Sequence, residues 1–225
     1  MNRKTVALVP VKLNNERLPG KNTKAFDGGK PLINYILNTI KMVKCIDEIF
    51  VYCSDPAICD FLPPEVHFLR RDSQLDLNTT LILDVLQRFA DDMDASIYVL
   101  AHATAPFLRA TTIEKCVSAV LSGDHDSAMT VSPLHEFVWH NGLPLYDTMK
   151  IPRTQDIKKI FIETTGLYVY KKELITHGRR IGDNPCLIEV DSTEAVDINV
   201  PVDFMVAQQI FNQLTLTENL NNGRP

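Results

Sequence analysis

Short apolar runs alternate with amphipathic stretches along the first 131 residues of the chain. Continuous apolar runs of strand length occupy 5–11, 49–53, 97–101 and 128–131. Between them, apolar residues recur every three or four positions in 32–40, 82–89 and 113–121. A parallel strand covered on both faces is continuously apolar, whereas the three- and four-residue spacing is typical of a helix. The pattern predicts a doubly wound α/β fold with a mostly parallel sheet, whose ligands bind beyond the carboxyl ends of its strands.

The pattern changes after residue 132. The segment 133–152 lacks helical periodicity, and its Asn141-Gly142 pair is a hairpin-turn signal, so we expect a protruding β arm there. Two further strands and a last helical stripe are expected at 166–170, 187–190 and 202–210.

Length and composition are those of one ordinary globular domain. The chain has 225 residues, of which 45% are hydrophobic and 23% charged, so it can bury one sizeable core. We expect a single domain over 1–214 and a frayed polar tail over 215–225. A net charge of −5 argues against nucleic acid as a partner, and no apolar stretch has the length of a membrane span. Five cysteines, an odd number, and no apolar leader after Met1 favour a cytoplasmic protein.

The loop after the first apolar run is densely cationic. Around Pro19-Gly20 it carries the basic residues Lys12, Arg17, Lys21, Lys24 and Lys30. A bend that contains glycine, together with basic side chains, is what phosphate oxygens bind, although a solvated basic loop has the same composition. The position after a buried strand favours a triphosphate site. The spacing of Gly20, Gly28 and Gly29 does not fit the dinucleotide-binding fingerprint, and the Walker A motif does not fit because Gly29-Lys30 is followed by Pro31.

Three segments in this region carry a resemblance to a known family: 9–12 (VPVK), 16–22 (ERLPGKN) and 29–32 (GKPL). They resemble the sugar-acid cytidylyltransferases, particularly the acylneuraminate branch, and the similarity extends to about Ile210. The resemblance implies a Rossmann-like nucleotide-diphospho-sugar transferase fold. It also implies that Lys12, Arg17, Lys21 and Asn22 hold the nucleotide, here CTP. Lys12 stands where the family usually has Arg, and a Lys keeps the charge but not the bidentate fork.

Two downstream loops extend the resemblance. Segments 70–80 and 102–109 (HATAPFLR) match family motifs, which implies that Arg71, Thr80 and Thr104 contact the nucleotide. Residues 78–80 also make an ordinary helix N-cap. In the second loop His102 and Ala105 replace a Gln and a Ser of the family. His102 is assigned to the sugar site, with a structural histidine and a general base as the alternatives.

The carboxyl-terminal part supplies the remaining candidate residues. Arg153 and Gln155 resemble the family residues that face the sugar acid, although loop Arg and Gln are often simply solvated. The segment 196–199 (VDIN) resembles an Asp-x-Asp motif whose carboxylates hold a catalytic Mg²⁺, which implies metal ligands at Asp197 and Asn199. Alternation places both on one side of an extended segment, and a single carboxylate with phosphates and waters suffices for Mg²⁺. Asn199 can instead cap the helix that follows.

The resemblance implies an enzyme that activates a 2-keto-3-deoxy sugar acid, sialic acid or a related nonulosonic acid, with CTP to give the CMP-sugar and pyrophosphate. Lys21 and Asp197 are the catalytic candidates, and the partners are CTP, the sugar acid and a second copy of the chain that contacts the arm. Two alternatives stay open. One is another sugar nucleotidyltransferase, for example one for 3-deoxy-manno-octulosonate; the other is a nucleotide-binding regulator with impaired catalysis, suggested by Lys12, Ala105 and Asn199.

Overall fold

The computed structural model describes the backbone of residues 4–222 and the side chains of residues 4–217, and its centre is one seven-stranded sheet. The strand order is β3-β2-β1-β4-β8-β5-β9. The strands are β1 (Thr5–Pro10), β2 (Glu48–Cys53), β3 (His67–Arg70), β4 (Ile97–Ala101), β5 (Ser127–Leu134), β8 (Ile160–Lys171) and β9 (Pro185–Glu189). All neighbouring pairs are parallel except the two that β8 forms with β4 and β5. The predicted doubly wound, mostly parallel sheet is therefore confirmed.

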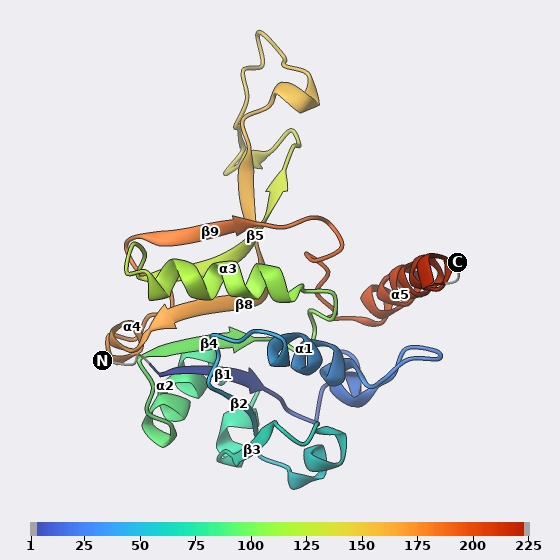
Figure 1. Ribbon diagram of the computed structural model, residues 1–225. Helices are drawn as coiled ribbons and strands as arrows, with labels where there is room; N and C mark the ends of the chain where they lie inside the picture. Colours follow the sequence, from blue (N-terminus) through green and yellow to red (C-terminus); the bar gives the residue numbers. More distant parts are fainter. Residues whose placement is uncertain (1–3, 223–225) are drawn as a thin grey trace.

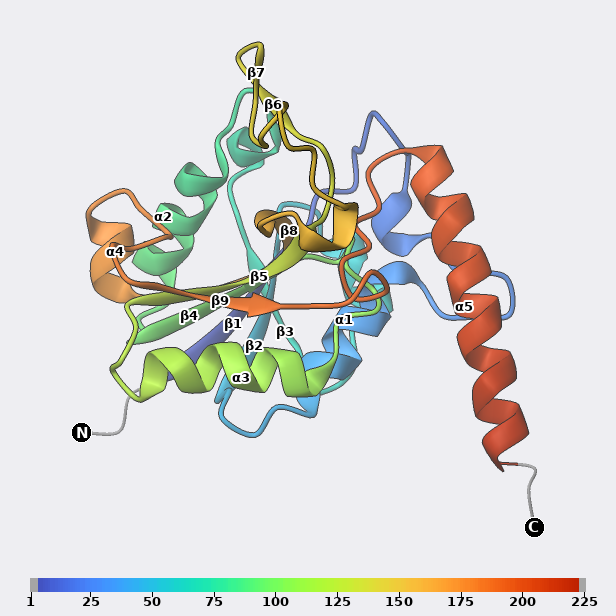
Figure 2. The same cartoon turned by 90° about the horizontal axis from the view of Figure 1, so that it is seen from above.

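Helices cover both faces of this sheet (Figure 2). One face carries α1 (Leu32–Lys41) and α3 (Ala110–Leu121), and the other carries α2 (Ile82–Asp92) and α4 (Lys172–Thr176). The helices α1, α2 and α3 bury the apolar stripes that the sequence predicts, for example Ile33, Ile36 and Ile40 of α1. The short helix α4 was not predicted. Four short 3₁₀ turns, Lys21–Thr23, Pro56–Phe61, Ser73–Asp76 and Thr154–Asp156, lie in the connections. The two-sided cover explains why β1, β2 and β4 are almost continuously apolar.

The expected β arm is present. β5 and β8 extend beyond the sheet, and between them lies a small hairpin of β6 (Trp139–His140) and β7 (Leu143–Pro144), which Figure 1 shows as the yellow projection. Its turn residues Asn141 and Gly142 have φ angles of 50° and 77°, the positive values that a type I′ turn requires. The arm exposes several large apolar side chains, namely Phe137, Trp139, Leu143, Leu145, Met149 and Ile151.

The last helix differs from the expectation. α5 (Pro201–Asn222) begins where predicted but continues through most of the segment expected to be a frayed tail, and it extends away from the body. Its first half packs through Phe204 and Ala207, and helix propagation adds one hydrogen bond for each further residue, so polar residues can continue a helix that is already anchored. Residues 223–225 lie outside the described part. Within residues 4–222, no helix combines the length and the apolar character that crossing a bilayer requires.

Candidate active site

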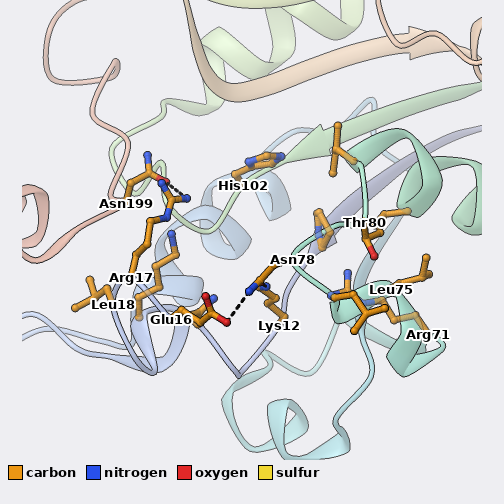
Figure 3. Close-up of a pocket in the computed structure, with 16 residues that line it drawn as sticks. Lys12, Glu16, Arg17, Leu18, Arg71, Leu75, Asn78, Thr80, His102 and Asn199 are labelled. Carbon is orange, nitrogen blue, oxygen red and sulfur yellow. Dashed lines mark hydrogen bonds between the residues drawn. The ribbon is translucent and has the colours of Figure 1, made fainter.

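Two adjoining cavities of about 540 and 430 Å³ lie beyond the carboxyl ends of β1 and β4. Both are lined by Lys12, Arg17, Lys21, His102 and Asn199, so they form one cleft, part of which Figure 3 shows. This is the edge of the sheet at which the parallel α/β pattern predicts ligand binding. The cleft therefore brings together residues from the first loop, from the loop after β4 and from the segment before α5.

The first loop is fixed by a small apolar cluster of its own. Leu18 and Phe26 of the loop pack with Ile198 and Phe204, which lie before and within α5. Gly20 has a φ angle of 66°, which a residue without a Cβ adopts readily, and the bend directs Lys21 into the cleft. Asn22 is buried and donates from Nδ2 to the Lys12 carbonyl oxygen at 3.0 Å. Asn22 thus stabilises the shape of the loop.

The side chain of Lys21 reaches from the first loop to the segment before α5. Its Nζ donates to the Ile198 carbonyl oxygen at 2.9 Å. Burial lowers the pKa of Lys21, and the neighbouring Asp197 carboxylate partly opposes that shift. A partly desolvated ammonium group gains more from an incoming phosphate than a fully hydrated one, because part of its hydration is already lost.

Lys12 lines the cleft but is already engaged. Its Nζ donates to the side-chain oxygen of Asn78 at 2.7 Å and to the Asp76 carbonyl oxygen at 3.3 Å. Asn78 in turn donates to a carboxylate oxygen of Glu16 at 2.5 Å, which Figure 3 shows as a dashed line. A nucleotide that used Lys12 would have to share it with this chain of side chains, which joins the first loop to the 76–78 segment.

Arg71 and Thr80 also line the larger cavity, and both are held by their own loop. The guanidinium group of Arg71 is buried and donates from Nε and Nη2 to one carboxylate oxygen of Asp76, at 3.1 and 2.6 Å. Thr80 Oγ1 donates to the Gln74 carbonyl oxygen at 3.1 Å. The alternative that residues 78–80 cap α2 is wrong, because α2 begins at Ile82 and the Leu81 amide donates to the Asp84 carboxylate at 3.0 Å.

His102 and Thr104 lie in the loop after β4. The His102 amide donates to the Gly166 carbonyl oxygen at 3.1 Å, and its Nε2 is buried without a hydrogen-bond partner. Burial lowers the pKa of His102 to about 4, so the ring is neutral at neutral pH and is a weak base. Thr104 lines the smaller cavity, and its carbonyl oxygen accepts from the Ile198 amide at 2.9 Å. These bonds fix this loop against β8 and against the 196–199 segment.

Asp197 and Asn199 lie side by side in the smaller cavity. Asp197 Oδ2 accepts from Asn199 Nδ2 at 2.6 Å and from Thr165 Oγ1 at 2.9 Å. The amide oxygen of Asn199 accepts from Arg17 at 3.2 Å, the contact drawn in Figure 3. Because Arg17 only donates and an ionised Asp197 only accepts, these neighbours dictate the orientation of the amide. Asn199 does not cap α5 with its side chain; Asp203 accepts from the Asn199 and Val200 amides instead.

The contacts of Asp197 and Asn199 decide which of these two residues could bind a metal ion. Among the side chains of residues 4–217, no cluster of three His, Cys, Asp or Glu residues could hold an ion. Mg²⁺ in nucleotide sites commonly takes only one or two protein carboxylates and completes its shell with phosphate oxygens and waters, so Asp197 fits such an ion. Asn199 can join it only if its amide turns away from Arg17, because the oxygen now points to that guanidinium group.

Arg153 and Gln155 lie just after the arm, at the short turn Thr154–Asp156, and the structure does not bring them to this cleft. Neither residue lines either cavity of the described chain. Arg153 pairs instead with Asp156 three residues away, at 2.6 and 3.2 Å. Both side chains are exposed.

Sequence reasoning missed Arg180, which precedes β9. Its guanidinium carbon lies 3.8 Å from the centre of the Tyr168 ring, and the Tyr168 hydroxyl donates to Glu163 at 2.6 Å. The charge of Arg180 also contributes to the low pKa of His102, so the two groups lie near each other. Among the described residues no carboxylate pairs with Arg180. Arg180 is the fourth residue after α4, in a segment without a motif that could have indicated its role.

Comparisons with known proteins agree with this geometry. Residues 6–172 match a family described as Cytidylyltransferase. The chain is 24% identical over 216 residues to N-acylneuraminate cytidylyltransferase A of Danio rerio, covering 90% of this chain and 50% of that protein. The present chain thus spans about half the length of that relative. It is also 24% identical over 222 residues to CMP-N,N'-diacetyllegionaminic acid synthase of Legionella pneumophila, covering 91% and 95% of the two chains.

A solved structure with the same fold is CMP:2-keto-3-deoxy-manno-octonic acid synthetase complexed with CTP. It has a TM-score of 0.70 and 17% identity, and the alignment covers 93% of this chain and 99% of that chain. At this identity the similarity concerns the fold. The family match covers most of the sheet and the first loop. The sequence segments around Lys21 indicated the same family. The chain belongs to the cytidylyltransferase family.

Proposed function

We propose that the chain transfers a cytidylyl group from CTP to a 2-keto-3-deoxy sugar acid. The observation that carries the proposal is the convergence of Lys21, Arg17 and Asp197 at one cleft beyond the carboxyl ends of β1 and β4. Cations beside a carboxylate suit a triphosphate and its metal ion. The names of two relatives, an acylneuraminate cytidylyltransferase and a legionaminic acid synthase, support sugar acids as the acceptor.

The reaction is a displacement at the α-phosphorus of CTP. The anomeric hydroxyl oxygen of the acid forms the new bond, the bond from the α-phosphorus to the bridging oxygen breaks, and pyrophosphate leaves with that electron pair. Lys21 binds the phosphate charge, and the fixed loop around Asn22 holds the nucleotide for in-line attack. Asp197 would hold Mg²⁺, which neutralises phosphate charge when bound. The hydroxyl proton passes to solvent, because His102 is too weak a base near neutral pH.

The acid itself is proposed to lie between His102 and Arg180. Arg180 stacks on Tyr168 and meets no carboxylate of the described chain, so a carboxylate of the substrate can pair with it. A sialic acid or a related nonulosonic acid is the preferred substrate, in keeping with the relatives' names.

A homodimer completes the proposal. The arm exposes apolar side chains, among them Trp139 at 58%, Leu143 at 69% and Met149 at 95%, and burying such a surface against a second copy is favourable. Arg153 and Gln155 would then reach the acid in the partner's cleft. Sedimentation should give about twice the chain mass of 25.4 kDa, and Leu143→Asp should shift the protein to monomers. A monomeric wild type would refute this part alone.

The test of the function is a substrate panel. Pyrophosphate release is measured with CTP, Mg²⁺ and each of N-acetylneuraminate, N,N'-diacetyllegionaminic acid and 2-keto-3-deoxy-manno-octonic acid, and each product is identified by mass. Turnover with a nonulosonic acid is expected. Turnover only with the octonic acid would transfer the proposal to that substrate, and tight CTP binding without turnover on any acid would indicate a regulator. Equal use of UTP or ATP would contradict the cytidine assignment.

A further inference from the structure

A bulge in β8 places a strained residue beside Asp197. Among the described residues, Asn141 and Thr165 are the non-glycine residues with a positive φ, at 50° and 57°. Asn141 sits in a hairpin turn and its side chain tolerates this region of backbone conformation. Thr165 is β-branched, and for such a residue a left-handed backbone is a genuine outlier. Strained residues of this kind gather at functional sites, where the surroundings enforce them.

The surroundings of the bulge account for its shape. The pairing of β5 with β8 shifts between Met129 and Val131, and β8 inserts extra residues there. On one side of Thr165, the buried Thr164 hydroxyl lies 2.7 Å from that of Thr130. On the other side, Gly166 packs so closely on the loop after β4 that a Cβ would lie 2.8 Å from the Cβ of Ala105. Both neighbours of Thr165 are therefore fixed in place, and Thr165 joins them by adopting a left-handed backbone conformation.

The bulge directs the Thr165 side chain to one group. Thr165 lines the smaller cavity, and its Oγ1 donates to Asp197 Oδ2 at 2.9 Å. Asn199 donates to the same oxygen at 2.6 Å. Two donors on Oδ2 fix the rotation of the carboxylate, and Oδ1 accepts no hydrogen bond from the described residues. Oδ1 is then the oxygen that remains for a ligand in the cleft.

We propose that Thr165 is a positioning residue, whose strained backbone conformation is retained because its hydroxyl holds the Asp197 carboxylate in a metal-binding orientation. The proposal rests on the proposed function for the role of Asp197. Groups that orient a metal ligand typically contribute about 10- to 100-fold in metal affinity or activity. A glycine at 165 would relieve the strain and also remove the hydroxyl, so stability and metal use should change in opposite directions.

Three variants separate the backbone from the hydroxyl. Thr165→Gly removes the Cβ and the hydroxyl, Thr165→Ala removes only the hydroxyl and the methyl group, and Thr165→Ser keeps the hydroxyl. The melting temperature without metal reports the strain. Calorimetric titration of CTP with and without Mg²⁺ gives the factor by which the metal tightens CTP binding, and this readout requires no turnover. The Mg²⁺ concentration for half-maximal pyrophosphate release is measured in parallel.

The glycine variant should melt about 2–4 °C above the alanine variant. Both should reduce the metal's effect on CTP binding and raise the half-activating Mg²⁺ concentration, each about tenfold. The serine variant should stay within about twofold of wild type, since its hydroxyl can make the same bond. Equal melting of the glycine and alanine variants would refute the strain, and unchanged metal effects in both would refute the positioning. If wild type turned over no sugar acid, the proposed function would fail, while calorimetry and melting would still decide the role of Thr165.

Discussion

Replacing Lys21 by methionine should weaken CTP binding and leave the stability of the fold nearly unchanged. Methionine keeps the length of the apolar stem and removes the ammonium group. That group donates to the Ile198 carbonyl oxygen and lines both cavities of the cleft. Lys21→Met therefore removes a cation from the phosphate site with little change in packing.

The expected loss of CTP affinity follows from one charge-assisted contact. A hydrogen bond to a charged group contributes about 1.5–3 kcal/mol, which corresponds to about a 10- to 150-fold rise in the CTP dissociation constant. For stability, two effects oppose each other. The bond to Ile198 is only partly buried, so its loss is at the lower end of that range, about 1.5 kcal/mol. Because the pKa of Lys21 is lowered in the folded chain, the charged form is disfavoured there, so the uncharged variant gains at neutral pH. The melting temperature should change by less than about 3 °C.

The assay is calorimetric titration of CTP together with thermal unfolding of the free protein. Lys24→Met is the matched control, because Lys24 is a cation of the same loop that lines neither cavity and lies 4.6 Å from the centre of the Phe204 ring. It should leave the CTP dissociation constant within about threefold of wild type.

Two results would refute this reasoning. An unchanged CTP dissociation constant in Lys21→Met would show that Lys21 does not bind the triphosphate. A melting temperature lowered by about 8 °C or more would show that Lys21 holds the loop together, and the affinity loss could then not be assigned to its charge.

Three further predictions concern His102, which lines the cleft, and two groups that do not line it, Arg180 and Asp76. His102→Gln should flatten the pH dependence of the melting temperature between about 4 and 6.5, because the folded pKa of His102 is lowered to about 4 and stability is lost as pH falls through this window; an equally steep curve in the variant would contradict that. Arg180→Met should raise the KM for the sugar acid about tenfold or more while CTP affinity stays unchanged, and a KM equal to that of wild type would remove Arg180 from the acid site. Asp76→Asn leaves the buried Arg71 without its carboxylate and should destabilise the protein by about 3 kcal/mol, seen as a fall of about 6–12 °C in melting temperature; a fall below about 2 °C would refute a structural role for the pair.

Much of the sheet could be predicted because its strands are buried on both faces. β4 is continuously apolar, and its predicted range is the observed one. The edge strand β3 was missed, since His67–Arg70 is half-exposed and mixes polar with apolar residues. The direction of β8 could not be predicted from the pattern either, because a buried strand has the same composition whether it runs parallel or antiparallel to its neighbours. The extension of α5 could not be predicted, because the residues beyond 214 are mainly polar. The helix continues there because its first half is anchored.

The residue pattern alone predicts the site only where its residues are close in sequence, whereas the distant His102, Thr104 and Asp197 were assigned through the family resemblance. The loop around Lys21 carries its cations in one segment, and the structure places that segment at the cleft. The partners of these residues come from distant segments: Lys12 meets Asn78, and Arg17 meets Asn199. No local pattern reports such contacts. Thr165 is a further case, because a β-branched residue gives no sign of a positive φ, and only the packing on either side imposes it.

The most direct test of the account is the rate of pyrophosphate release by Asp197→Asn, measured with CTP, Mg²⁺ and the sugar acid that wild type uses. Asparagine keeps the size of the side chain and removes the charge that suits a metal ion bound to triphosphate. We expect turnover to fall about 100-fold or more, with metal-free CTP affinity and the melting temperature close to wild type. Turnover at the wild-type rate would contradict nucleotidyl transfer at this cleft.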